Sequence, residues 1–282
     1  DVERSRGLGD VYKRQVIYNL DGVNVAITSD HYPLYCDFKK PTGLGEYPKA
    51  EGDLRIGNYF LTYCKGTDGV IDYDRTGRII AKMNADIVCL QGLDKETERS
   101  EGIDQLNVLA QKANMHDYFA KAIDYKGGEF GVGILTKEEP VSVDRYQMAG
   151  KSEMRAAMVV EYEKFVVAST NFDTDMAKRI EALQTLETKL SAYNKPAFLL
   201  GYFNEGDLES EFFQMVKSNW NLLSADKSTE VSGKKRRLDF IVSLKSHNVN
   251  VTQADVIESL SGVDVTVAST HYPLFCDFSG LK

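Results

Sequence analysis

The chain carries an aspartate–histidine pair, Asp30 and His31, in a segment that recurs near the other end of the sequence. Residues 16–38 read VIYNLDGVNVAITSDHYPLYCDF, residues 256–278 read VIESLSGVDVTVASTHYPLFCDF, and 14 of the 23 aligned positions are identical. A carboxylate beside an imidazole can ligate a divalent cation and hold or transfer a proton near neutral pH. In the second copy Thr270 precedes His271, so this copy has lost the carboxylate.

The two copies lie 240 residues apart, because residue 16 aligns with residue 256. A period of this length corresponds to a whole domain and not to a solenoid repeat. We therefore interpret the chain as the end of one domain followed by a complete second copy, as in a tandem array. The expected parts are a non-native leader that resembles translated adapter sequence (residues 1–15), the closing strands of a preceding repeat (16–38), a linker rich in Lys, Pro and Gly (39–52) and one domain (53–282).

The composition is that of an ordinary soluble globular protein, with 43% hydrophobic and 27% charged residues. The net charge of −8 makes a nucleic-acid partner unlikely, because non-specific affinity for nucleic acid comes largely from Lys and Arg. No apolar run approaches the roughly 18–20 residues of a membrane span. These features predict a soluble protein and leave periplasmic, secreted and cytoplasmic locations open.

The four cysteines, Cys36, Cys64, Cys89 and Cys276, lie in or at the end of apolar runs. They form no CxxC motif and no Cys/His cluster with zinc spacing. We expect them to be small buried hydrophobic side chains.

The hydrophobic pattern alternates between short strands and amphipathic helices. Helices are predicted at residues 75–84, 103–113, 177–193 and 209–216, and strands at residues 54–63, 86–90, 131–135, 141–146, 157–162, 165–169, 197–200 and 238–244, with 263–268 and 272–278 closing the domain. Several strands follow one another directly, which a strictly alternating parallel fold does not allow. The pattern therefore favours an α+β sandwich of two mixed β-sheets packed face to face with outer helices.

Seven segments, in this order, resemble the endonuclease/exonuclease/phosphatase superfamily, which includes deoxyribonucleases, neutral sphingomyelinases and inositol-polyphosphate phosphatases. Each segment alone is a weak signal, but seven in register over most of the domain are specific. The resemblance implies the same two-sheet sandwich, with an active site at one end. The segments are 54–60 (LRIGNYF), 86–92 (DIVCLQG), 131–135 (GVGIL), 168–173 (ASTNFD), 200–204 (LGYFN), 236–241 (RRLDFI) and 269–273 (STHYP).

The resemblance implies hydrolysis of phosphodiesters or phosphomonoesters with Mg²⁺ or Mn²⁺. Such a hard cation takes oxygen ligands and stabilises charge on the phosphoryl oxygens. In the family an Asp activates water, a His contacts the phosphate and a second Asp orients that His. This sequence retains Asn204, Asp239 and His271 at family positions, and Asp239 is expected to hydrogen-bond His271.

Five other family positions are substituted, and they carry the metal and the water activator. By this resemblance, Phe60 replaces an Asn and Gly92 replaces the metal-binding Glu. Asn171 replaces a His. Tyr202 replaces the water-activating Asp, and Thr270 replaces the metal-side Asp. Phe, Gly, Tyr and Thr carry no charge at neutral pH and ligate hard cations poorly. We therefore expect no metal or other cofactor in this domain and no catalysis, whereas Asp30 and His31 are a remnant of an upstream copy with an intact triplet.

Three functions remain open at this stage. In the first, the domain is non-catalytic and binds a ligand, a protein or its catalytic sibling. In the second, it is a hydrolase whose site is rewired to acids such as Asp173, Asp94 or Glu205. In the third, it is a structural array member that spaces or dimerises active domains. A small phosphorylated ligand fits the first function. Arg155, Arg179 and the basic run at residues 234–237 (KKRR) are candidates to line the same end of the sandwich, and the alternative for the basic run is a solvated loop.

A folding hypothesis follows from the repeat. Residues 16–38 and 256–278 compete for one place in the sandwich, and an isolated strand pair has exposed edges. We predict that residues 16–38 are poorly packed or make an intermolecular contact.

Overall fold

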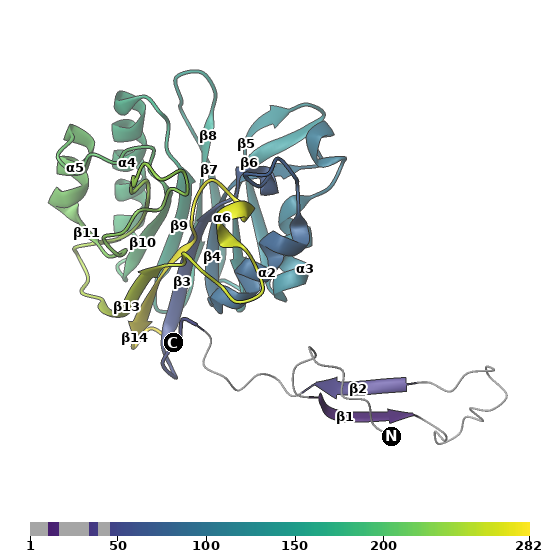
Figure 1. Ribbon diagram of the computed structural model, residues 1–282. Coiled ribbons are helices and arrows are strands. Elements are labelled where there is room, and N and C mark those ends of the chain that lie inside the picture. Colours follow the sequence, from purple (N-terminus) through teal and green to yellow (C-terminus); the bar gives the residue numbers. More distant parts are fainter. Residues whose placement is uncertain (1–10, 17–33, 39–45) are drawn as a thin grey trace. The chain divides into compact units, whose positions relative to one another are not determined.

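A computed structural model describes residues 11–16, 34–38 and 46–282, and the chain divides into two compact units, Asp1–Gly45 and Glu46–Lys282 (Figure 1). In the first unit, strands β1 (Val11–Val16) and β2 (Leu34–Phe38) pair antiparallel. Asp30 and His31 lie outside the described residues, as does most of the segment that we predict to be poorly packed.

The second unit contains two mixed sheets of six strands, as the sequence pattern predicted. One sheet has the order β13 (Asn250–Val256), β14 (Leu274–Ser279), β3 (Leu54–Phe60), β4 (Ile87–Lys95), β6 (Gly128–Thr136) and β5 (His116–Tyr125). The other has the order β11 (Trp220–Leu222), β12 (Asp239–Leu244), β10 (Ala197–Tyr202), β9 (Val166–Asn171), β8 (Arg155–Glu161) and β7 (Ser142–Met148).

Each sheet has one parallel pair, and a helix makes the crossover within each pair. Strands β3 and β4 are parallel and joined through α2 (Tyr73–Met83), and strands β9 and β10 are parallel and joined through α4 (Met176–Ser191). Both helices begin at an aspartate, Asp72 or Asp175, whose side chain accepts a backbone N–H of the first turn. The parallel pairs direct the carboxyl ends of four central strands to one end of the sandwich.

The remaining helices cover the outer faces. Figure 1 shows α4 and α5 (Glu211–Asn219) on the outside of one sheet and α2 and α3 (Gln105–Ala113) on the outside of the other. Residues 263–268, expected among the closing strands, instead contain the short helix α6 (Val265–Ala268), which precedes β14. Three apolar clusters separate these layers, one between the sheets and one under each helical layer. No helix in the described residues is long and apolar enough to cross a membrane.

Four strands were not predicted from the sequence, namely β1 in the first unit and β5, β11 and β13 in the second. β5 and β13 are edge strands with few buried positions, so their sequences lack the continuous apolar runs of central strands. The helix predicted at residues 103–113 is α3, and β5 begins at His116 soon after it ends. The prediction of buried thiols is confirmed for Cys64, Cys89 and Cys276.

The pairing of β1 with β2 repeats the pairing of β13 with β14. Val16 faces Leu34 as Val256 faces Leu274, and each register shifts once, after Val11 in one hairpin and after Val251 in the other. These positions differ by the same 240 residues as the sequence repeat. The structural correspondence therefore reaches into residues 11–15, the segment interpreted from sequence as a leader.

Candidate functional site

The retained Asp239 and His271 meet at the end of the sandwich to which the parallel strands point. Asp239 begins β12, and His271 lies three residues before β14, so the pair connects the two sheets. Nδ1 of His271 and Oδ2 of Asp239 are 2.6 Å apart, and both side chains are buried. The hydrogen bond expected from sequence is present, and it orients the imidazole.

The environment favours the protonated form of His271. Burial by itself lowers the pKa of an imidazole, but the Asp239 carboxylate outweighs it, so the pKa of His271 is raised above its ordinary value of 6.5. Asp239 has a second oxygen, Oδ1, that is buried without a hydrogen-bond partner among the described residues. The pair therefore retains the character of a charged histidine held by a carboxylate.

Two aromatic rings cover the imidazole. Phe60 ends β3 and Tyr202 ends β10, and their ring centroids lie 4.7 Å and 4.8 Å from that of His271. The Phe60 and Tyr202 rings are themselves 4.7 Å apart, with planes tilted by 58°. Burial, followed by the negative charge of Asp239, raises the pKa of the Tyr202 phenol, so even less of this phenol is deprotonated at neutral pH. Both rings occupy positions where the resemblance led us to expect polar residues.

Gly92 lies beside the Phe60 ring in a backbone conformation that favours glycine. Gly92 lies at the register shift between β4 and β6 with φ of +73°, a conformation that residues with side chains adopt at a cost. A Cβ added there would meet Cε2 of Phe60 and the backbone N of Thr62 at 3.3 Å. The space beside Gly92 is therefore partly filled by the Phe60 ring.

The other two substituted positions make local hydrogen bonds. The hydroxyls of Thr270 and Thr62 are 3.0 Å apart. Asn171 ends β9, and its Oδ1 accepts a long hydrogen bond of 3.4 Å from Nδ2 of Asn204. Asn204 also donates to the carbonyl of Phe172 at 2.7 Å, so it is used to hold the strand end.

The two candidate arginines lie near this end but are held by carboxylates. Nε of Arg155 is 3.0 Å from Oδ2 of Asp173. Arg179 is buried, contacts Oε2 of Glu205 at 3.0 Å and donates to the carbonyl of Asn204 at 3.2 Å. Both guanidiniums are therefore already paired with carboxylates.

Glu230 and Arg236 are neighbours of the site that the sequence analysis missed as a pair. Glu230 forms an isolated β-bridge with His271, and its carboxylate binds Arg236 through two contacts of 2.7 Å. The Arg236 guanidinium lowers the pKa of Glu230 to about 2. Arg236 belongs to the basic run at residues 234–237, but nothing local in the sequence pairs it with an acid six residues earlier.

A polar cavity of about 430 Å³ lies beside the site, between the loop after β10 and the basic run. Asn204, Glu205 and Asp207 line one side, and Lys235, Arg236 and Arg237 line the other. Charges of both signs face this cavity, so its lining is not selective for anions alone.

The residues at the implied metal site do not fit Mg²⁺ or Mn²⁺. Such a cation needs oxygen ligands, whereas Phe60 and Gly92 offer none and the Thr270 hydroxyl contacts Thr62. Within residues 46–282, no three His, Cys, Asp or Glu side chains gather closely enough to hold a metal ion. No chemical step at this site is therefore derived through a metal.

The raised pKa of His271 has a consequence for stability that can be measured. A histidine whose pKa is higher in the folded state stabilises the fold fully below about pH 6.5, and this contribution is lost as pH rises through the raised value. We expect the free energy of unfolding in urea to fall from about pH 5 to about pH 8 more steeply in the wild type than in His271→Gln. The Asp239→Asn variant should also lose this slope, and identical slopes in all three proteins would contradict the charged pair.

Comparisons with known proteins bear on the fold. No protein-family model and no curated protein matches the sequence. Solved structures do match. An endonuclease/exonuclease/phosphatase from Beutenbergia cavernae DSM 12333 has a TM-score of 0.70 at 19% identity, covering 82% of this chain and 73% of that one. A mannosyl-6-phosphatase from Bacteroides thetaiotaomicron VPI-5482 has a TM-score of 0.63 at 16% identity, covering 80% of this chain and 99% of that one. The human Nocturnin catalytic domain, solved with a bound sulfate anion, has a TM-score of 0.59 at 20% identity, covering 82% and 96%.

These similarities confirm the fold that the seven motifs predicted. The chain has the endonuclease/exonuclease/phosphatase fold, and its structural neighbours include phosphoesterases. At these levels of identity the likeness concerns the fold and leaves the activity of this chain to its own residues.

Proposed function

We propose that residues 53–282 form a non-catalytic domain with a phosphoesterase fold, which acts as a binding or regulatory partner of an active upstream copy. The observation that carries this proposal is the aromatic cover on the Asp239–His271 pair. Two rings lie within 4.8 Å of the imidazole centroid, where a hydrolase of this fold requires a hydrated cation, a nucleophilic water and a phosphate. A small phosphorylated ligand or the sibling domain is then the partner, and no nucleic acid is required.

The size of the lost contributions supports this proposal. Removing a single preorganised electrostatic element from an active site commonly costs about 10²–10³ in rate. Here a metal ligand and the water activator are replaced together by Gly92 and Tyr202, and their effects on rate need not add. Burial also raises the pKa of Tyr202, so even less of its phenol is deprotonated and available as a base at neutral pH.

A hydrolase with a rewired site is the second candidate, and the acids it would use are already engaged. Asp173 binds Arg155 at 3.0 Å, Asp94 binds Arg99 at 2.5 Å, and Glu205 binds Arg179 at 3.0 Å. Each acid would have to leave an arginine before it could ligate a cation. A purely structural or dimerising array domain is the third candidate, and no observation favours it over a binding role.

A titration of the purified chain with MgCl₂ and MnCl₂ by calorimetry tests the proposal. We expect no binding at sub-millimolar concentration and no metal-dependent hydrolysis of bis-(p-nitrophenyl) phosphate, whereas an active enzyme of the same fold shows both in parallel. The Asp173→Ala and Glu205→Ala variants should behave like the wild type. Sub-millimolar binding that either variant abolishes would establish the rewired hydrolase instead.

The regulatory part of the proposal has its own test. Turnover by the full-length parent protein should change when residues 53–282 are deleted. Unchanged kinetics would leave the domain with a spacing role only.

A further inference from the structure

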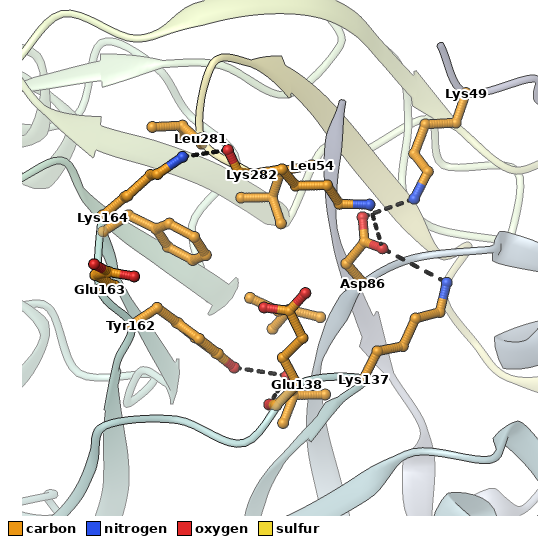
Figure 2. Close-up of a pocket in the computed structure, with 13 residues that line it drawn as sticks. Lys49, Leu54, Asp86, Lys137, Glu138, Tyr162, Glu163, Lys164, Leu281 and Lys282 are labelled. Carbon is orange, nitrogen blue, oxygen red and sulfur yellow. Dashed lines mark hydrogen bonds and ion pairs between the residues drawn. The ribbon is translucent and has the colours of Figure 1, made fainter. Parts of the chain in front are cut away.

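A second concave site lies at the opposite end of the sandwich from Asp239 and His271. It is a pocket of about 450 Å³ that opens between the first residues of β3 and β4 and the turn joining β8 to β9 (Figure 2). The paired registers place Leu54 and Ile87 at this end, whereas Phe60 and Gly92 lie at the other. The pocket therefore shares no residue with the candidate site described above.

The inner wall of the pocket is apolar and belongs to the core between the sheets. Leu54, Ile87, Tyr162 and Phe165 are all buried members of this cluster, and Leu281 packs against it. The Tyr162 ring stacks on Phe165 with centroids 4.7 Å apart, and its hydroxyl donates to Oγ1 of Thr136 at 2.9 Å. A ligand entering here would bury apolar surface against rings and aliphatic side chains.

Three lysines from separate segments converge on one carboxylate at the mouth. Nζ of Lys49 lies 2.7 Å from Oδ2 of Asp86, and Nζ of Lys282 and Nζ of Lys137 lie 3.0 Å and 3.6 Å from Oδ1 (Figure 2). Asp86 also accepts the backbone N–H of Arg55 at 2.8 Å, so its two carboxylate oxygens are shared among four donors. Counted over the whole lining, four lysine side chains, with Lys164 the fourth, face three side-chain carboxylates, so a small excess of positive charge remains.

The ammonium groups repel one another in this arrangement. Burial lowers the pKa of Lys49 first, and the charges of Lys282 and Lys137 lower it further, against the opposing effect of Asp86. A second anion at the mouth would relieve this repulsion. Two further carboxylates of the lining, on Glu138 and Glu163, belong to exposed residues.

We propose that this pocket binds a small amphiphilic anion, a carboxylate on an apolar body. The carboxylate lies among the Nζ atoms of Lys49, Lys137 and Lys282, and the apolar body lies against Leu54 and Phe165. The volume is within the range of small-molecule sites, which are mainly apolar with a few placed polar groups. The inference is independent of the proposed loss of catalysis.

Octanoate is the probe for this site, with 1-octanol as the uncharged control of the same chain length. We expect calorimetry of the whole chain to show one saturable octanoate site and at least about tenfold weaker binding of octanol, because the alcohol lacks the charge-assisted contacts. Octanoate should also displace 8-anilinonaphthalene-1-sulfonate, whose fluorescence reports an apolar anion site.

Two variants with opposite expected effects on octanoate affinity distinguish binding in this pocket from non-specific binding. Lys137→Met, at an exposed position, should weaken octanoate about tenfold, and Glu138→Gln should tighten it about two- to fivefold by removing a negative charge from the lining. Lys217→Met, which removes an exposed lysine paired with Glu209, and His271→Gln should leave the affinity unchanged. No binding, equal binding of octanol, or an affinity insensitive to both pocket variants would overturn the proposal.

Discussion

Replacing Arg55 by methionine is expected to lower the free energy of unfolding by about 3–5 kcal/mol, the cost of breaking a buried ion pair by removing one partner. Arg55 is fully buried in β3, and its Nε and Nη2 contact the two carboxylate oxygens of Asp277 at 2.6 Å and 2.7 Å. Its Nη1 donates to the carbonyls of Tyr47 and Met83, and its guanidinium lies 3.9 Å from the centroid of Phe275. Methionine fills similar space and leaves all of these acceptors unpaired.

Urea unfolding followed by far-ultraviolet circular dichroism measures this change. Asp277→Ala should cost a similar amount, because it leaves the guanidinium buried without its partner. The double variant Arg55→Met/Asp277→Leu should recover part of the loss, although the carbonyls that Arg55 satisfied remain unpaired. Lys178→Ala, which breaks an exposed pair with Glu181, is the control and should cost less than about 1 kcal/mol. A loss in Arg55→Met no larger than in this control would show that the pair does not stabilise the fold.

The central strands and the helices were predictable because their signal is local. β4, β9 and β10 are buried almost throughout and read as continuous apolar runs, and α2 and α4 show helical spacing after a capping aspartate. β13 (NVTQADV) is an edge strand that buries one residue fully, so its alternation is too weak to predict a strand. Its equivalence to β1 became visible only from the shared register.

The site was predictable in its residue types and not in its contacts. The motifs placed Phe60, Gly92 and Tyr202 at family positions, and pairing Asp239 with His271 followed from the roles that the family gives them. The packing of the three rings, however, depends on side-chain directions at the ends of two separate sheets. Partners such as Arg55 and Asp277 are 222 residues apart, and no local spacing rule connects them.

The lysine cluster around Asp86 was likewise not predictable from the sequence. Its members come from a segment before β3, the end of β6 and the end of β14, which only the strand registers bring together. In the sequence each lysine is an ordinary surface residue. A site made of residues that share no motif is therefore accessible only from the structure.

Placing a glutamate at Gly92, where the family resemblance expects a metal ligand, should lower the free energy of unfolding by about 3–5 kcal/mol and create no metal site. Gly92 is buried, and its φ of +73° places any side chain in a strained conformation, which costs about 1–2 kcal/mol by itself. The Cβ of the new side chain would contact the Phe60 ring, and its carboxylate would be buried without a partner. Gly92→Ala isolates the backbone strain from the cost of the buried charge.

The double variant Phe60→Asn/Gly92→Glu decides whether the two substitutions are coupled. Because Asn frees the space that the Phe60 ring occupies, the double variant should be more stable than the sum of the single changes by about 1 kcal/mol or more, measured as a double-mutant cycle in urea. Additive effects, or sub-millimolar Mg²⁺ binding by Gly92→Glu alone, would show that the aromatic ring does not block the site. Positive coupling would mean that the Phe60 ring contributes to the cost of a glutamate at position 92, and that this cost falls when the ring is removed.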